Sequence, residues 1–267
     1  MSAGTLLCGS PDAPPVMLIH GLGSSYRVWD RVVALIEPTA RIYAVELDAT
    51  GSIDGDADAV AALLDRPMLL VGHSRGGLVA TAVAERHREL VSKLILVCPS
   101  WSVSSRLSAN GPTERALSVP LIGDLLWALA SPRQQRRAMQ NAFAPGTSVP
   151  DQFVADMRAR GRRSLTDSSR AIDDYLKAAR LADRLEKLAV PTELIFGRHD
   201  ARVAAPRDEF SALCNTSLVV LPGIGHSPPW EAPGAVAEVI AHSLASQSRT
   251  RGPGSTVVAA QRRKVSG

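Results

Sequence analysis

The sequence is poor in cysteine and has no long apolar run. Cys8, Cys98 and Cys214 are three thiols at wide spacing in 267 residues. Such a set predicts neither a disulfide framework nor a metal site, and it suits a reducing cytoplasm. The chain lacks an apolar run of the roughly 18 residues that a membrane span needs, and residues 1–10 lack the features of a secretory signal. We therefore expect a cytoplasmic protein that spans no membrane and holds no metal or other cofactor.

A signature of nucleic-acid binding is also missing, although the net charge is +4. Residues 247–267 contribute +5 of this charge, so residues 1–246 carry −1. This end of the chain is rich in Ser, Gly, Thr and Arg without an amphipathic period, which predicts a disordered, solvated basic tail. Because no nucleic-acid motif accompanies it, we expect no nucleic-acid partner. Residues 100–190 hold 14 basic and 9 acidic residues, a surplus that suits a solvated helical surface or an anionic partner.

The rest of the chain alternates strand-like and helix-like segments. Hydrophobic residues make up 45% of the sequence, which is enough to bury a sizeable core. The short, continuous apolar runs are typical of strands buried on both faces, so the pattern predicts an α/β fold with a mainly parallel sheet. Strands are expected at residues 14–21, 41–47, 66–74, 92–100, 191–197 and 216–223. Helices are expected at residues 27–36, 57–64, 77–88, 207–213 and 234–245.

Residues 101–188 interrupt this alternation. They contain several helical stretches, separated by prolines, and no convincing strand. We interpret them as a helical insertion between two strands of the main sheet. Its helices are expected at residues 113–130, 133–143, 151–160 and 169–188.

The candidate nucleophile is Ser74, in the sequence GHSRG at residues 72–76. An apolar strand leads into this motif and a helix-forming stretch follows it. A serine at such a turn is held in a strained conformation with its hydroxyl exposed, and Gly72 and Gly76 leave room for the turn. The plainer alternative is a serine that caps an ordinary helix.

A serine hydroxyl needs a base, and the base needs an orienting group. His226 lies in a Gly- and Pro-rich loop after the last expected strand, and Asp200 follows the strand before it. The carboxyl ends of parallel strands converge on one crevice, so both side chains are well placed. Gly21 and its neighbours form a tight loop after the first strand. We expect the backbone N–H groups of Leu22 and Arg75 to face a developing oxyanion, and His20 to brace the loop.

These motifs resemble the α/β-hydrolase superfamily over about residues 6–245. They read HGLGSSYRVWD, GHSRGG, PTELIFGRHD and GIGHSPPWEAP, in the familiar order and spacing. The resemblance implies an α/β-hydrolase fold, with residues 1–100 and 189–246 as the core and residues 101–188 as a helical cap or lid. It also implies Ser74 as nucleophile, His226 as general base and Asp200 as the acid that orients it.

The sequence departs from the family pattern at three places. Glu46 stands where an aspartate is usual, in a loosely matching loop. The N-terminal segment is short for the family's first hairpin, so the sheet is expected to lack a strand. Arg75 follows the nucleophile, where an apolar residue is common; we expect it to point along the surface or to form a structural ion pair, with a substrate anion as the alternative.

The resemblance implies a serine hydrolase that cleaves an ester, thioester or lactone through an acyl-enzyme. A serine nucleophile argues against the dehalogenases and epoxide hydrolases of this fold, which use aspartate. Carbon–carbon bond hydrolases, cofactor-free perhydrolases and hydroxynitrile lyases keep the same triad and stay open as alternatives, and so does a non-catalytic ligand-binding protein. The basic cap would suit an acidic acyl carrier protein as partner.

We expect the substrate pocket to lie between the loop after the first strand and the cap. If apolar cap side chains line it, a medium-sized apolar acyl group would fit, although such residues commonly form ordinary core. The candidate lining residues are His20, Gly21, Trp101, Leu121, Ile122, Leu125, Leu126, Trp127, Met139 and Phe143.

Overall fold

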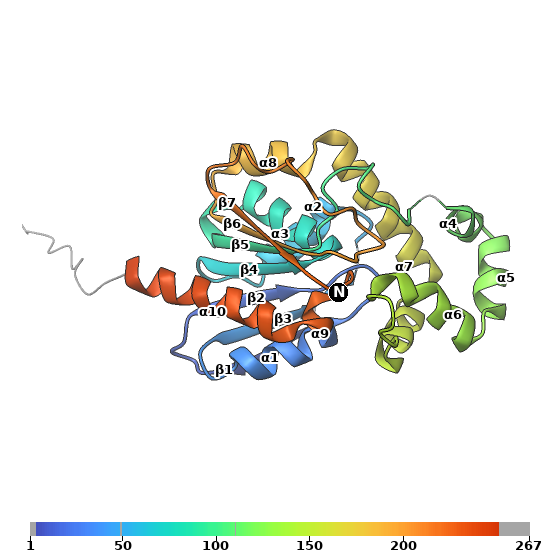
Figure 1. Ribbon diagram of the computed structural model, residues 1–267, viewed down its shortest axis with the longest axis horizontal. Coiled ribbons are helices and arrows are strands. Elements are labelled where there is room, and N and C mark those ends of the chain that lie inside the picture. The colour runs from blue at the N-terminus through green and yellow to red at the C-terminus, as the bar shows by residue number, and fades with distance from the viewer. Residues whose placement is uncertain (1–3, 49, 110, 251–267) are drawn as a thin grey trace, which may run out of the picture.

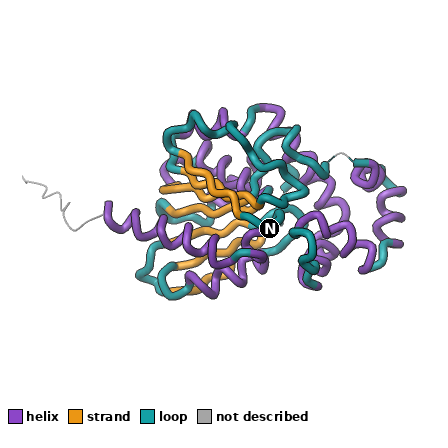
Figure 2. Tube along the Cα trace, viewed as in Figure 1, coloured by secondary structure: helices purple, strands orange, loops and turns teal. Residues whose placement is uncertain are grey.

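A computed structural model describes residues 4–48, 50–109 and 111–250. Its centre is a seven-stranded sheet in the order β1-β3-β2-β4-β5-β6-β7 (Figures 1 and 2). All neighbouring strands are parallel except β1 and β3, which are antiparallel. The strands are β1 (Gly4–Gly9), β2 (Pro15–Ile19), β3 (Arg41–Glu46), β4 (Met68–His73), β5 (Val91–Val97), β6 (Thr192–Gly197) and β7 (Thr216–Leu221). The predicted α/β fold with a mainly parallel sheet is confirmed.

Strand β1 was not predicted from the sequence. It lies at the sheet edge and pairs with β3 from Gly4 opposite Glu46 to Gly9 opposite Arg41. An edge strand lacks the two-faced burial that produces a recognisable apolar run, so its sequence signal is weak.

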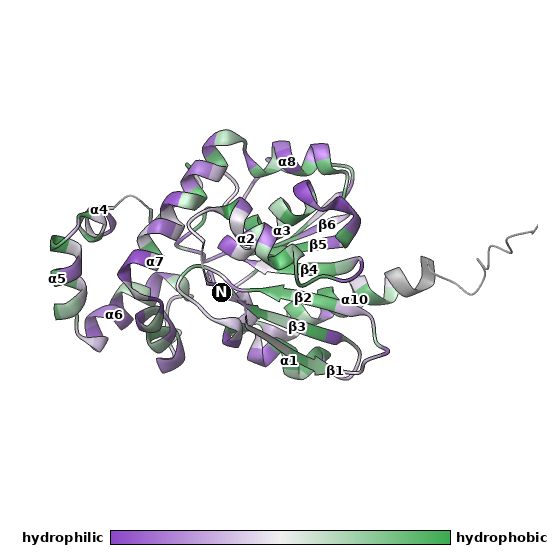
Figure 3. Cartoon of the chain, turned by 180° about the vertical axis from the view of Figure 1, so that it is seen from behind, coloured by the Kyte–Doolittle hydropathy of each residue, from purple (hydrophilic) through white to green (hydrophobic). Residues whose placement is uncertain are grey.

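Helices cover both faces of the sheet because each central strand is apolar on both sides. In β2, Met17 and Ile19 face the core shared with α2 (Ile53–Ala61), α3 (Arg75–Arg86) and α8 (Leu181–Leu188). Val16 and Leu18 face the opposite core, shared with α1 (Asp30–Ile36) and α10 (Pro233–Thr250). This alternation is the two-residue period of a strand, and Figure 3 shows the resulting apolar centre beneath more polar helices.

Four cap helices and a short turn lie between β5 and β6, grouped at one end of the molecule (Figure 1). The predicted helix over 113–130 is broken, because Pro120 follows the end of α4, and α5 starts after it. The predicted helices at 151–160 and 169–188 are instead a long α7, kinked at Gly161 with φ of 75°, and the separate α8. The elements are α4 (Pro112–Ser118), α5 (Ile122–Leu129), α6 (Pro132–Met139), η3 (Gln140–Ala142) and α7 (Asp151–Ala178).

The helix predicted at residues 207–213 is wrong, since this segment forms turns and bends. The Arg207 N–H donates to the Glu209 carboxylate at 2.5 Å, and the Ser211 hydroxyl donates to the Asp208 carbonyl at 2.7 Å. Such local bonds offer the backbone an alternative to a helix. The short elements η1 (Tyr26–Trp29), η2 (Arg88–Leu90) and α9 (Pro228–Glu231) complete the fold.

The predicted basic tail, residues 247–267, lies outside the described residues from position 251 onward. Helix α10 continues to Thr250, so the prediction of a disordered tail is wrong for residues 247–250, because the helix that starts at Pro233 extends through them. In the described ranges, no helix combines the length and apolarity that crossing a bilayer requires.

Candidate active site

Ser74 lies at the sharp turn between β4 and α3. Its backbone has φ of 53° and ψ of −117°, a conformation that is strained for a residue with a side chain. The Ser74 N–H donates to the Val97 carbonyl at 2.7 Å, which ties the turn to β5. The turn also needs glycine on both sides: a Cβ on Gly72 would lie 2.3 Å from the Gly76 carbonyl oxygen, and one on Gly76 would lie 2.3 Å from the Ile19 carbonyl oxygen.

The structure brings Ser74, His226 and Asp200 together at the carboxyl edge of the sheet. The His226 Nε2 lies 2.9 Å from the Ser74 Oγ, and the His226 Nδ1 lies 2.7 Å from the Asp200 Oδ2. A carboxylate accepts hydrogen bonds, so Nδ1 carries the proton and Nε2 is left as an acceptor for the serine hydroxyl. This tautomer is the one that removes a proton from serine.

Asp200 is fixed and ionised by its surroundings. Its Oδ1 accepts hydrogen bonds from the backbone N–H groups of Arg202, at 2.8 Å, and Val203, at 2.9 Å. Burial alone raises the pKa of Asp200 and is the largest effect, but the electrostatic interaction and hydrogen bond with His226, together with these two N–H groups, outweigh it. The pKa of Asp200 is therefore lower than its ordinary value.

The loop after β2 lies against the nucleophile, as expected. A Cβ on Gly21 would lie 3.1 Å from the Ser74 Cβ. In the described part of the chain, the backbone N–H groups of Leu22 and Arg75 have no backbone acceptor. Unpaired N–H groups beside a nucleophile are available to an incoming oxygen.

His20 braces this loop and does not line the cavity beside Ser74. Its Nδ1 donates to the Gly21 carbonyl at 2.9 Å, and its Nε2 accepts from the Leu47 N–H at 3.1 Å. Arg160, from the cap helix α7, also donates to this Nε2 at 3.2 Å. Burial lowers the pKa of His20 to about 3, so the ring is neutral.

Arg160 is a link between cap and core that the sequence analysis missed. Its guanidinium donates to the Ser24 carbonyl at 3.0 Å and the Leu47 carbonyl at 2.6 Å, and it pairs with the Glu46 carboxylate. Glu46 also accepts a hydrogen bond from the Tyr26 N–H at 3.1 Å. The unusual glutamate thus anchors the cap, and its departure from the family pattern was the only available signal.

His73 is a second residue that the sequence analysis did not single out. Its Nε2 donates to the His226 carbonyl at 2.7 Å, and its ring centroid lies 5.3 Å from that of His226. Burial, followed by the electrostatic effect of the neighbouring His226 ring, lowers the pKa of His73 to about 3. A neutral ring therefore holds the loop that carries His226, and the place of His73 inside the GHSRG motif was the only hint.

Arg75 forms a structural ion pair, one of the two roles expected for it. Its guanidinium donates to the Asp56 carboxylate, and the two side chains are 4% and 0% exposed. The Thr50 N–H and hydroxyl also donate to Asp56, at 2.7 and 2.8 Å. Arg75 is therefore buried beneath the turn and does not point along the surface.

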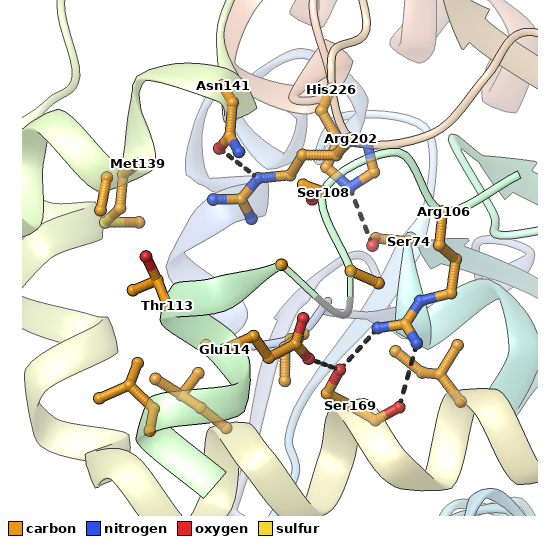
Figure 4. A pocket seen from close by; sticks show the side chains of 18 of the residues that line it. Ser74, Arg106, Ser108, Thr113, Glu114, Met139, Asn141, Ser169, Arg202 and His226 are labelled. Atoms are coloured by element: carbon orange, nitrogen blue, oxygen red, sulfur yellow. Dashed lines mark hydrogen bonds between the residues drawn. The ribbon is translucent and has the colours of Figure 1, made fainter. Parts of the chain in front are cut away.

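A cavity of about 440 Å³ opens beside Ser74 and His226 (Figure 4). Its lining combines apolar cap side chains, including Met139, with polar groups such as Arg106 and Arg202. Gly21 lines a small adjoining cavity that also contains Ser74.

Most of the proposed cap lining was wrong. The Trp101 Nε1 donates to the Ala204 carbonyl at 2.7 Å, and its ring packs against the core. Trp127 belongs to α5 and is partly buried, but it does not line the cavity. Phe143 is core. The exposed side chains are Leu121, Ile122, Leu125 and Leu126, at 81%, 55%, 60% and 44%.

One group of side chains in the described ranges has metal-ligand spacing: Cys98, Asp200 and His226, whose ligand atoms lie within 4.8 Å of one another. Burial raises the pKa of the Cys98 thiol well above its ordinary value, so it stays protonated. A protonated thiol is a poor ligand, and Asp200 and His226 already bond to each other. Asp200 and His226 therefore fit the hydrogen-bonded series with Ser74 better than they fit a metal-binding site.

A parallel sheet with a serine at a strand-to-helix turn, and an acid and a histidine on two later loops of the same edge, defines the class of α/β-fold hydrolases. The model of the alpha/beta hydrolase family matches residues 16–239. The chain belongs to the alpha/beta hydrolase family, and the prediction of a hydrolase enzyme is confirmed.

Known proteins agree with this assignment. Over 237 residues the chain is 31% identical to the pimeloyl-[acyl-carrier protein] methyl ester esterase of Neisseria meningitidis serogroup A, covering 82% of this chain and 73% of that protein. It is 24% identical to the human monoacylglycerol lipase ABHD6, over 89% of this chain and 77% of that one. A solved thermophilic esterase from Thermogutta terrifontis shares the fold, with a TM-score of 0.73, 19% identity and coverage of 91% and 93%.

Proposed function

We propose that the chain hydrolyses carboxylic esters through an acyl-enzyme on Ser74. The hydrogen-bonded series from Ser74 through His226 to Asp200, facing a cavity, carries the proposal. His226 takes the hydroxyl proton as the Ser74 oxygen attacks the ester carbonyl. Asp200 stays ionised because of its lowered pKa, and it stabilises the imidazolium that forms.

The tetrahedral intermediate places its negative oxygen against the backbone N–H groups of Leu22 and Arg75. Removing one such donor costs an enzyme about 3–4 kcal/mol of transition-state stabilisation. His226 then gives its proton to the leaving alcohol. A water molecule, deprotonated by the same ring, releases the acid and restores Ser74.

In this proposal helices α4 to α7 form a cap over the reacting serine. Helix α8, the last helix of residues 101–188, packs in the core of the sheet instead. Arg160 ties the cap to the loop after β2. The cap also supplies most of the side chains of the cavity wall. Its residues would therefore select the substrate, while core residues would carry the chemistry.

The first experiment is labelling with a fluorophosphonate, followed by intact mass measurement. The wild type should gain one phosphonyl group and Ser74→Ala none. A panel of carboxylic esters, thioesters, lactones and carbon–carbon substrates then ranks the reactions open to this triad. If a well-folded wild type reacts with neither the probe nor any substrate, the esterase proposal is refuted, and ligand binding without catalysis becomes the better account.

An acyl carrier protein is the candidate macromolecular partner. The support is the similarity to esterases whose names specify a carrier-bound methyl ester, together with the basic surplus of residues 100–190. A carrier-bound methyl ester should be cleaved with a higher kcat/KM than the free methyl ester, and salt should reduce the difference. Equal rates would leave a small-molecule ester as the substrate.

We place the enzyme in the cytoplasm because its three cysteines are free thiols.

A further inference from the structure

Arg202 occupies an unusual place in the cavity wall. It follows Asp200 by two residues, and its N–H donates to the Asp200 Oδ1 at 2.8 Å. On its other side, the Arg202 carbonyl accepts from the Leu107 N–H at 2.8 Å. The backbone of Arg202 is therefore fixed relative to the triad, and its side chain enters the same cavity as Ser74 and His226.

The guanidinium of Arg202 is only partly used. Its Nε donates to the Asn141 Oδ1 at 2.9 Å, and Figure 4 shows the end of the group extending past Asn141 into the cavity. Among the residues that the structure describes, no carboxylate lies within ion-pair distance of it, and its two Nη atoms make no hydrogen bond. Glu114, the acidic side chain of the cavity wall, instead accepts from Ser169 near Arg106.

This lack of a partner separates Arg202 from other arginines of the fold. Five arginines with side chains 4–14% exposed each have a carboxylate partner. The pairs are Arg75–Asp56, Arg106–Asp173, Arg160–Glu46, Arg162–Asp124 and Arg184–Glu85. A cation removed from bulk water is costly unless an anion compensates it. Burial lowers the pKa of Arg202, against the opposing charge of Asp200, although a guanidinium stays protonated in proteins.

We propose that Arg202 is a substrate-binding residue that receives a carboxylate of the substrate other than the ester being cleaved. The inference rests on the proposed esterase function. With Nε bonded to Asn141, the two Nη atoms leave one open edge with parallel N–H donors. A planar carboxylate accepts two such bonds side by side, and its single negative charge matches the single positive charge of the Arg202 guanidinium.

The substrate class that follows is a half-ester of a dicarboxylic acid, or an ester whose alcohol part carries a carboxylate. The cavity has room for a small molecule of this kind, because pockets of about 300–1,000 Å³ hold such ligands. A free half-ester offers Arg202 a carboxylate, whereas the carrier-bound methyl ester considered above does not. These two substrate candidates therefore predict opposite results in the charge comparison that follows.

The test compares two activated esters of the same shape: mono-p-nitrophenyl adipate, which ends in a carboxylate, and p-nitrophenyl adipamate, which ends in a carboxamide. The corresponding suberate ester and its carboxamide analogue test a longer distance between the ester and the charged end. The wild type should prefer the carboxylate ester in kcat/KM. Arg202→Met should reduce that preference about 30-fold or more, as expected when one partner of a desolvated charge pair is removed, and Arg202→Lys should keep part of it. Arg198→Met, which removes an exposed arginine of the same loop, is the matched control and should keep the preference.

Loss of activity toward both esters in equal proportion would overturn the inference and indicate that Arg202 only supports the Asp200 loop. Absence of any charge preference in the wild type would also overturn it. Calorimetry separates this result from failure of the esterase proposal. The Ser74→Ala enzyme should bind adipamate, the free acid amide, at least tenfold more tightly than adipamide, and adding Arg202→Met should abolish the difference. If no ester is cleaved but this difference is found, the esterase proposal fails and the carboxylate site stands.

Discussion

The buried pair of Arg75 and Asp56 gives the sharpest prediction about stability. Asp56→Ala leaves the Arg75 cation without its partner beneath the nucleophile turn, and it removes the acceptor of two hydrogen bonds from Thr50. Breaking a buried pair by removing one member costs about 3–5 kcal/mol, because the remaining charge is uncompensated. We therefore expect Asp56→Ala to lower the free energy of unfolding by about 4 kcal/mol, a large part of the roughly 5–15 kcal/mol of a typical domain.

A double-mutant cycle separates the orphaned charge from the lost contacts. Arg75→Met should cost about 3 kcal/mol by the same reasoning. The double variant should cost little more than Asp56→Ala alone, because the methionine removes the uncompensated cation. The coupling free energy is then about 3 kcal/mol, within the range for residues in direct contact.

Urea unfolding followed by tryptophan fluorescence measures all four free energies, with unchanged m-values as the check that the transition stays comparable. The exposed pair of Arg86 and Asp58, whose side chains are 43% and 46% exposed, is the matched control and should show little coupling. Costs of Asp56→Ala and Arg75→Met that simply add, within about 0.5 kcal/mol, would refute the reasoning.

Three further predictions concern pH, the turn and the cap. His20 and His73 have pKa values lowered to about 3, so the unfolded chain binds protons that the folded chain does not; their contribution is full above about pH 6.5 and falls as the pH drops toward 3. Between pH 7 and pH 5 each should remove about 2 kcal/mol of stability in urea unfolding, and a flat profile would contradict the neutral rings. Gly76→Ala would place a Cβ 2.3 Å from the Ile19 carbonyl oxygen; we expect activity toward p-nitrophenyl esters to fall by about 100-fold or more, as for a misplaced nucleophile, and near-normal activity would show that the turn can shift. Trp127→Ala should change kcat/KM by less than about twofold because Trp127 does not line the cavity; a larger loss would return it to the pocket.

The strongest local patterns in the sequence predicted the structure well. The apolar run that ends at His73 is buried on both faces, so its two-sided pattern could be recognised without neighbours. Gly72 is required by a contact within the turn, because its Cβ would meet the Gly76 carbonyl oxygen, whereas Gly76 is required by the Ile19 carbonyl oxygen of the neighbouring strand β2. Segments without such strong local patterns were predicted wrongly or missed. The edge strand β1 buries too little to produce a signal, and residues 207–213 have helix-forming composition but satisfy their backbone with local side-chain bonds.

Contacts between segments that are distant in the sequence could not be predicted from it. No spacing in the sequence indicates that Arg160 binds the loop after β2, that Asp56 neutralises Arg75, or that Trp101 bonds to the Ala204 carbonyl. The cap residues show the difficulty most clearly. An apolar stripe on a helix predicts burial, but Leu125 of α5 is 60% exposed, and the sequence does not state which helix faces are left uncovered.

The sequence by itself determined the α/β alternation, the turn at Ser74 and the chain order of serine, acid and histidine. Each depends on residues that are neighbours along the chain, or on strands whose carboxyl ends must share one edge. Only the tertiary structure decided which side chains line the cavity and which charges are paired. Arg202 is the clearest case: as a residue type it resembles the paired arginines, and only the packing of the cap against the Asp200 loop leaves its guanidinium without an anion.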